Sequence, residues 1–140
     1  MEDLHLSFDI VAGDMSRAGE ASSAVKQTLR KMGFDSDTIR RVSVCMYEGE
    51  INMVIHANGG VAEVDVGLDE IKIALRDVGP GIPNIEKAMQ EGYSTAGENA
   101  RGLGFGAGMG LPNMKKYSDE MTVESTVGVG TTVTMVVKAP

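Results

Sequence analysis

The sequence has little that could cross-link the chain or hold it in a membrane. Its 140 residues include one cysteine, Cys45, which excludes an internal disulfide and is compatible with a reducing compartment. No apolar run approaches the roughly 18 residues that a membrane span needs. The first ten residues, MEDLHLSFDI, lack the basic start of a signal peptide. We therefore expect a cytoplasmic protein that stays out of the membrane and forms a single domain over residues 1–140.

Positive charge and aromatic side chains are also scarce. There are 13 Lys and Arg against 20 Asp and Glu, giving a net charge of −7, and there is no tryptophan. This balance argues against nucleic acid, whose binding needs a basic patch. It leaves room for a nucleotide, because phosphate sites are built from backbone amides, a metal ion and a few cations. The ten methionines are expected to fill the core, although an adaptable interface is an alternative.

Several familiar motifs for metals and phosphates are missing. The two histidines, His5 and His56, lie far apart and offer no local metal-site spacing. There is no G-x-x-x-x-G-K-[ST], which excludes a P-loop. No G-x-G-x-x-G occurs either, which argues against a dinucleotide-binding fold.

The apolar periodicity that is present predicts the order β, α, α, β, β, loop, α, β, β. The expected strands cover residues 4–10, 61–66, 71–78, 121–126 and 131–138, and the expected helices run from Asp14 or Ser16 to 32, from Asp35 or Ser36 to about 58, over 84–91 and over 109–117. Alternating strands leave one sheet face wet, so helices should cover the other. The fold class is therefore α+β, a two-layer α/β sandwich whose sheet we expect to be mixed and mostly antiparallel.

Glycine is concentrated in one region. Nine of the 18 glycines lie between residues 79 and 110, where backbone freedom matters more than burial. This density predicts a glycine-rich lid over about residues 84–108.

The second predicted helix carries a polar stripe. Glu48, Asn52 and His56 follow each other at four-residue intervals, so they share one side of the helix amid apolar neighbours. A solvated helix edge with a contact between Glu48 and Asn52 is the alternative. Glu50 is rotated by about 200° from Glu48, so we expect it to face elsewhere and to be neutral for function. Gly49 lies inside this predicted helix, where glycine costs up to about 1 kcal/mol relative to alanine.

Two further segments suit a phosphorylated ligand. Asp77 ends a predicted strand and precedes Gly79 and Gly81, so a carboxylate there could accept a hydrogen bond while the backbone approaches closely; a plain turn is the alternative. The run from Gly102 to Gly110 leads into a helix, and bare amides at a helix N-terminus suit phosphates. A flexible linker is the alternative there.

These features together resemble a known family. An E-x-x-x-N helix, a D-x-G-x-G turn, a glycine-rich lid and a terminal G-T-T strand, in this order, look like the Bergerat (GHKL) ATP-binding fold. That superfamily includes histidine kinases, gyrase-type ATPases and anti-sigma serine kinases. The segments DVGPGIPNIEKAMQEGYST and GLPNMKKYSDEM resemble most closely the RsbT-like switch kinases. The resemblance extends from about residue 4 to residue 138.

The resemblance implies a role for each matching residue. Glu48 matches the general base, Asn52 matches the Mg²⁺ ligand that bridges to the ATP phosphates, and Asp77 matches the carboxylate that reads the adenine amino group. His56 is read as structural. The other implied nucleotide contacts are Gly79, Gly81, Arg101, Gly102, Gly104, Gly108, Gly110, Thr131 and Thr132.

The implied activity is that of an ATP- and Mg²⁺-dependent protein serine/threonine kinase in a partner-switching pathway. Its expected substrate is a STAS-domain antagonist, and a phosphatase or sigma factor is a candidate second partner; a homodimer stays open. Neither histidine lies on the separate helical hairpin that a histidine kinase needs. The alternative is a non-catalytic ATP-binding regulator of the anti-sigma or phosphatase-activating type.

Overall fold

The predicted order of elements is found in the structure. The computed structural model describes residues 4–13, 15–56, 59–79, 89 and 110–140. Its elements are β1 (Leu4–Ile10), the 3-10 turn η1 (Met15–Arg17), α1 (Glu20–Lys31), α2 (Ser36–His56), β2 (Gly60–Val66), β3 (Glu70–Asp77), α5 (Gly110–Tyr117), β4 (Glu120–Thr126) and β5 (Gly130–Lys138). Apart from Met89, the helix expected over 84–91 and the lid expected over 84–108 lie outside the described residues.

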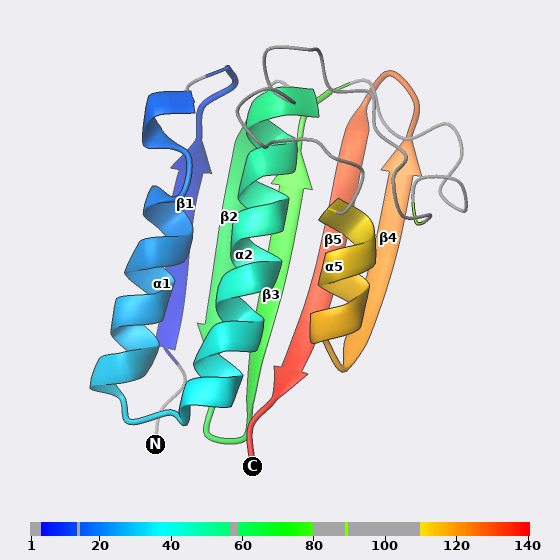
Figure 1. Ribbon diagram of the computed structural model, residues 1–140. Coiled ribbons are helices and arrows are strands. Elements are labelled where there is room, and N and C mark those ends of the chain that lie inside the picture. Colours follow the sequence, from blue (N-terminus) through cyan, green and yellow to red (C-terminus); the bar gives the residue numbers. More distant parts are fainter. Residues whose placement is uncertain (1–3, 14, 57–58, 80–88, 90–109) are drawn as a thin grey trace.

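The five strands form one open sheet in the order β1-β2-β3-β5-β4. All four pairings are antiparallel, whereas we expected some parallel pairing. The three α-helices of the described residues, α1, α2 and α5, lie on one face of this sheet (Figure 1). On β3, Ile71, Ile73 and Leu75 are buried on that side, while Lys72 and Arg76 on the other side are exposed. The two-layer α+β prediction is confirmed.

The core lies between the helices and the sheet, and methionines help to fill it. Met46, Met53, Met114 and Met135 are at most 2% exposed. Cys45, also fully buried, donates its thiol to the Met114 carbonyl oxygen at 3.7 Å. Burial raises the pKa of this thiol to about 12. The methionines named here therefore act as core residues, as predicted.

The first helix begins later than predicted and is capped from elsewhere. It starts at Glu20, after Gly19 in the left-handed region at φ 98°, so neither Asp14 nor Ser16 caps it. The Glu50 carboxylate of α2 instead accepts hydrogen bonds from the backbone amides of Gly19, Ala21 and Ser22 at 3.0, 3.2 and 3.1 Å. A carboxylate there satisfies amides that have no partner within the helix and opposes its dipole.

Glu50 is therefore a structural residue. It is 2% exposed, and it faces α1 while Glu48 faces α5. The expectation that it faces away from Glu48 is confirmed, and its hydrogen bonds to α1 show a structural role that we did not expect; that it is neutral for function stays a prediction. A local pattern could not show this, because the capped amides lie about 30 residues earlier in the chain.

Gly49 lets α2 lie directly on the sheet. A Cβ atom at this position would stand 2.0 Å from Cδ1 of Leu75 on β3. Leu75 is 3% exposed, so it has little room to move away. The close approach of helix to strand therefore explains the glycine that helix propensity alone disfavours.

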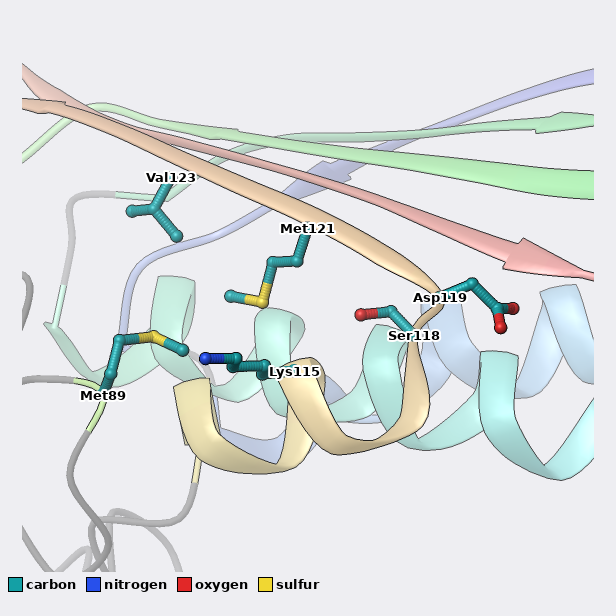
Figure 2. A pocket seen from close by; sticks show the side chains of 6 residues that line it. All are labelled: Met89, Lys115, Ser118, Asp119, Met121 and Val123. Carbon is teal, nitrogen blue, oxygen red and sulfur yellow. The ribbon is translucent and has the colours of Figure 1, made fainter.

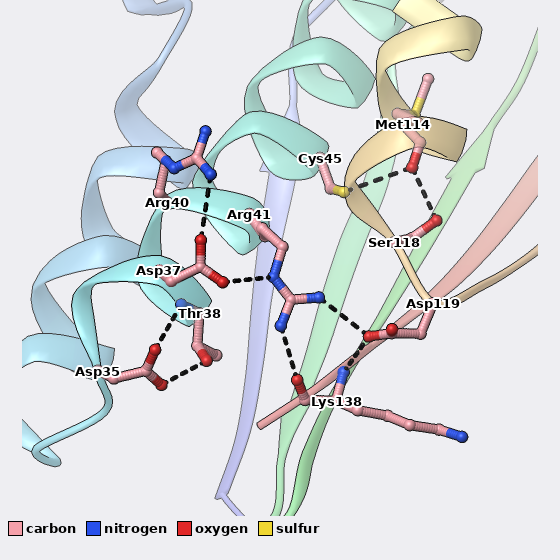
Figure 3. A network of polar contacts seen from close by, with 10 residues as sticks. All are labelled: Asp35, Asp37, Thr38, Arg40, Arg41, Cys45, Met114, Ser118, Asp119 and Lys138. Atoms are coloured by element: carbon pink, nitrogen blue, oxygen red, sulfur yellow. Dashed lines mark hydrogen bonds and ion pairs between the residues drawn. The ribbon is translucent and has the colours of Figure 1, made fainter. Parts of the chain in front are cut away.

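A polar cluster around Arg41, here called the clamp, consists of Arg41, Asp37, Asp119 and Lys138 and lies near the start of α2 (Figure 3). The Arg41 guanidinium donates to Asp37 at 3.2 Å, to Asp119 at 3.1 Å and to the Lys138 carbonyl oxygen at 2.8 Å. The Lys138 backbone amide also donates to Asp119. This bond is the largest cause of the lowered pKa of the Asp119 carboxyl, and the Arg41 guanidinium lowers it further. A lowered folded-state pKa contributes stability above the unfolded-state pKa, and this is lost as the pH falls through the folded-state value. These bonds join the first half of α2 to the turn that follows α5 and to the end of β5.

Among the helices that the structure describes, none is both long and apolar enough to cross a membrane.

Candidate functional site

Predicted site residues from four elements meet toward one end of the helix-covered face. Asn52 lies in the second half of α2, Gly110 begins α5, Asp77 ends β3 and Thr131 stands near the start of β5. These segments all lie toward the upper end of the view (Figure 1). Gly81, Arg101, Gly102, Gly104 and Gly108 lie outside the described residues.

The first turn of α5 contacts the polar stripe of α2. A Cβ atom on Gly110 would stand 2.9 Å from Nδ2 and 3.0 Å from Oδ1 of Asn52. One turn earlier on α2, the Glu48 Oε1 atom accepts a hydrogen bond from Nδ2 of Asn113 at 3.2 Å. Glu48 and Asn52 are both partly buried. The stripe is therefore covered in part by a second helix, which excludes the fully solvated edge.

Asn113 was missed by the sequence interpretation. Its signal is that it follows Gly110 by three residues on the helix predicted over 109–117. Two helices packed antiparallel can bring such a pair onto residues spaced by four, as Glu48 and Asn52 are. Only pairing the two helices in space reveals the contact.

A second part of the site is a polar row across the ends of the strands. Asp77 pairs with Gly60 of β2, and its Oδ1 atom accepts the Thr131 backbone N–H at 2.9 Å. The Thr131 hydroxyl lies 2.9 Å from that of Ser125, its partner on β4. A Cβ atom on Gly130 would stand 2.3 Å from the Asp77 carbonyl oxygen, so glycine lets the two chain segments approach closely.

The strand alternation separates the two candidate threonines. Thr131 is 6% exposed and lies beside Asp77 on the helix-covered face. Thr132 pairs with Arg76 and Glu124, whose side chains are exposed on the opposite face. The structure thus brings Thr131, and not Thr132, to the Asp77 carboxylate.

The electrostatics of Asp77 follow from its position. Burial raises the pKa of this carboxyl, and the bond from the Thr131 amide partly offsets the shift. Among the residues that the structure describes, this amide is the one donor to the carboxylate, and it uses Oδ1. The second oxygen, Oδ2, therefore has the chemistry to accept a donor on a ligand. Gly79, two residues on, is buried and donates its amide to the Val129 carbonyl oxygen at 3.2 Å.

The two parts of the site adjoin through Met53 and Gly60. A Cβ atom on Gly60 would lie 2.7 Å from both Cε of Met53 and Cα of Asp77. Met53 directly follows Asn52, so α2 reaches the strand that carries Gly60 next to the residue that ends the contact of α2 with α5.

Among the described side chains, that of Asn52 offers an amide oxygen for the expected Mg²⁺. No group of three or more His, Cys, Asp or Glu side chains able to hold a metal occurs among the residues that the structure describes. Mg²⁺ keeps several waters and is commonly held by one or two protein groups together with substrate phosphates. An amide oxygen such as that of Asn52 fits this manner of binding.

A separate hollow of about 360 Å³ lies between α5 and the edge strand β4. Its lining residues are Met89, Lys115, Ser118, Asp119, Met121 and Val123. Figure 2 shows Met89, Lys115 and Met121 pointing toward a common space. None of the predicted nucleotide residues that the structure describes is in this lining.

Comparison with known proteins identifies the family. A family model described as histidine kinase-like ATPase domain matches residues 11–137. The chain belongs to this ATPase family. The GHKL resemblance inferred from the sequence is thereby confirmed.

Among related members of the ATPase family is the serine/threonine-protein kinase RsbT of Bacillus subtilis. It is 33% identical over 110 residues, which cover 76% of this chain and 77% of RsbT. The anti-sigma F factor of Geobacillus stearothermophilus is 29% identical over 137 residues, covering 94% and 88% of the two chains.

A solved structure supports the fold of this family member. The crystal structure of the RsbU and RsbW domains of a Mycobacterium tuberculosis protein matches with a TM-score of 0.60 over 99% of this chain. The identity is 15%, and the match spans 33% of the other chain, so this likeness concerns the fold alone.

Proposed function

We propose that this protein is an ATP- and Mg²⁺-dependent serine/threonine kinase of a partner-switching pathway that phosphorylates a STAS-domain antagonist. The observation that carries the proposal is the pairing of Glu48 with Asn52, one turn apart on α2, beneath the first turn of α5. The relative named as a serine/threonine-protein kinase supports it. The single-domain organisation over residues 1–140 and the cytoplasmic location are part of the same proposal.

Three side chains have distinct roles in this proposed reaction. Asp77, fixed through Oδ1 by the Thr131 amide, accepts the adenine amino group through Oδ2. Asn52 holds Mg²⁺, which neutralises phosphate charge when it is bound. Glu48 takes the proton of the attacking hydroxyl as the new oxygen–phosphorus bond forms and the bond to the ADP oxygen breaks. Such a reaction needs mainly positioning and charge neutralisation, which this arrangement can supply.

Several relatives favour a second candidate function. Three relatives whose matches cover 94% of this chain are named anti-sigma F factors. By that analogy the protein would bind a sigma factor or another regulator, with ATP serving only to set its conformation. Glu48 would then have no partner hydroxyl to deprotonate.

One experiment separates the two functions. The purified protein is mixed with γ-labelled ATP, Mg²⁺ and purified STAS domains, and the label is followed on the partner. If the protein is a kinase, we expect labelled phosphoserine or phosphothreonine on a STAS domain. A stable complex without any transfer, for every STAS domain tested, would instead support the regulator.

Adenine recognition predicts a strong effect of Asp77→Asn. The variant keeps the shape of the side chain but turns one acceptor oxygen into a donor, which cannot satisfy both Thr131 and adenine. We expect ATP binding to weaken by roughly 1–3 kcal/mol in calorimetry. Asp69→Asn, on an exposed residue of the β2–β3 turn, is the matched control and should bind ATP normally. An unchanged affinity in Asp77→Asn would remove the adenine assignment.

The raised pKa of Asp77 adds a pH dependence with a definite sign. Only the ionised carboxylate offers both oxygens as acceptors. Because burial raises this pKa, ATP affinity should begin to fall at a higher pH than for an ordinary carboxyl group as the solution is acidified. The Asp77→Asn variant should lose this part of the pH dependence, and its persistence would point to another titrating group.

A further inference from the structure

The contact between Asn113 and Glu48 links two helices at the proposed reaction centre. Nδ2 of Asn113 donates to Oε1 of Glu48 at 3.2 Å, in a partly buried setting. An amide nitrogen can only donate and an ionised carboxylate can only accept, so the direction of this bond is fixed. Among the residues that the structure describes, Asn113 is the one side-chain donor to Glu48, and it uses Oε1, so Oε2 can meet a second donor on a substrate.

Asn113 stands on a firmly held element. Its neighbours Leu111 and Met114 are 7% and 1% exposed, so the inner face of α5 belongs to the core. The Met114 carbonyl oxygen accepts bonds from Cys45 of α2 and from the hydroxyl of Ser118. Asp119, just beyond the helix, joins the clamp to Arg41. The donor that reaches Glu48 is therefore supplied by a helix anchored to α2 at several points.

The two contacts of α5 match the spacing of the stripe. Gly110 lies at Asn52 and Asn113 lies at Glu48, so α5 follows the stripe in the opposite direction. Three residues of one helix rise about 4.5 Å and four residues of the other rise about 6 Å, a small difference for neighbouring helices. One helical turn thus contacts both the proposed metal ligand and the proposed base.

We propose that Asn113 is a positioning residue for Glu48, holding its carboxylate through Oε1 so that Oε2 faces the hydroxyl of the protein substrate. The inference rests on the proposed function, because it requires Glu48 to be the proton acceptor. A general base acts only within hydrogen-bond reach of its proton. A displacement of about 1 Å at a reacting group can cost about 100-fold in rate, so a rotamer held by a neighbour matters for turnover more than for binding.

Two substitutions at Asn113 test this role. Asn113→Ala removes the donor, and Asn113→Asp keeps the shape while placing an acceptor opposite the Glu48 carboxylate. We expect kcat for phosphorylation to fall by about 10–100-fold in both, with the KM for ATP and for the partner unchanged. Gln27→Ala, which removes an exposed amide from α1, is the control and should keep the wild-type kcat. Wild-type kcat in both Asn113 variants, or a loss carried by KM, would overturn the inference.

A double-mutant cycle separates this inference from the proposed function. If Asn113 acts through Glu48, adding Asn113→Ala to Glu48→Gln should lower kcat no further. If the two residues act independently, the two fold-losses in kcat should multiply. If Glu48→Gln itself keeps wild-type transfer, the catalytic assignment fails and the inference fails with it. If Glu48→Gln is inactive and only the Asn113 variants are normal, the inference alone fails.

A measurement without activity tests the contact itself. The side-chain NH₂ resonances of Asn113 should shift in Glu48→Gln and stay in place in Glu70→Gln, a matched change on an exposed residue at the far end of β3. If the Asn113 NH₂ resonances were the same in the wild type, Glu48→Gln and Glu70→Gln, the bond would not be made in solution. That result would overturn the inference whatever the kinase assay shows.

Discussion

Replacing Glu48 by glutamine is expected to lower phosphorylation of the partner protein by roughly 10²–10⁴-fold. The amide keeps the shape of the side chain but cannot take the proton of the attacking hydroxyl. Asn52 and Asp77 are unchanged, so ATP and the partner should still bind. Single-turnover transfer of label from ATP to the STAS domain measures the rate, and calorimetry measures the binding.

The control for this experiment has to be chosen from the structure. Glu50, only two residues away, is unsuitable because its carboxylate caps α1. Glu70→Gln makes the same chemical change at an exposed position, at the opposite end of β3 from Asp77. Turnover should be normal in Glu70→Gln. A loss of similar size in both variants, or full turnover in Glu48→Gln, would contradict the role of Glu48 as base.

The second large effect concerns stability and involves Glu50. Replacing Glu50 by alanine is expected to lower the free energy of unfolding by about 2–5 kcal/mol, because the amides of Gly19, Ala21 and Ser22 lose an ionised acceptor at buried or partly buried positions. Urea denaturation followed by circular dichroism measures this change. Hydrogen exchange should also quicken at the start of α1.

Glu20→Ala provides the comparison. Glu20 stands in the same first turn of α1, but its side chain is 61% exposed and pairs with Arg17 on the surface. Such surface pairs contribute at most about 1 kcal/mol. If the urea midpoint of Glu50→Ala were no lower than that of Glu20→Ala, the cap would not be a major source of stability.

Local pattern was enough for the elements of this fold. The alternation around Ile71 and Ile73 predicts a strand with one buried face, and the apolar periodicity before Gly33 predicts the end of α1. Gly33 has a φ of +85°, a conformation in which glycine is favoured at a helix end. The stripe of Glu48 and Asn52 and the carboxylate at the end of β3 were also visible, because each depends on a short spacing.

What the sequence could not show depends on contacts between distant segments. The start of α1 is fixed by Glu50, and the glycine at position 49 is required by Leu75 on another element. The contact of Asn113 with Glu48 joins residues 65 positions apart. The choice between Thr131 and Thr132 was within reach, since a strand places successive side chains on opposite faces and Thr131 shares the face of Asp77.

The complete burial of Cys45 makes the reactivity of its thiol a measure of how well the core is closed. A thiol with a pKa of about 12 and no exposed surface stays protonated at neutral pH and out of contact with solvent, so maleimides and similar reagents should pass it by while the core is closed. A cysteine engineered on any surface helix could then carry a fluorophore without removal of the native one. Under native conditions the slow alkylation of this thiol by an excess of reagent would report how often the layer between α2 and α5 opens.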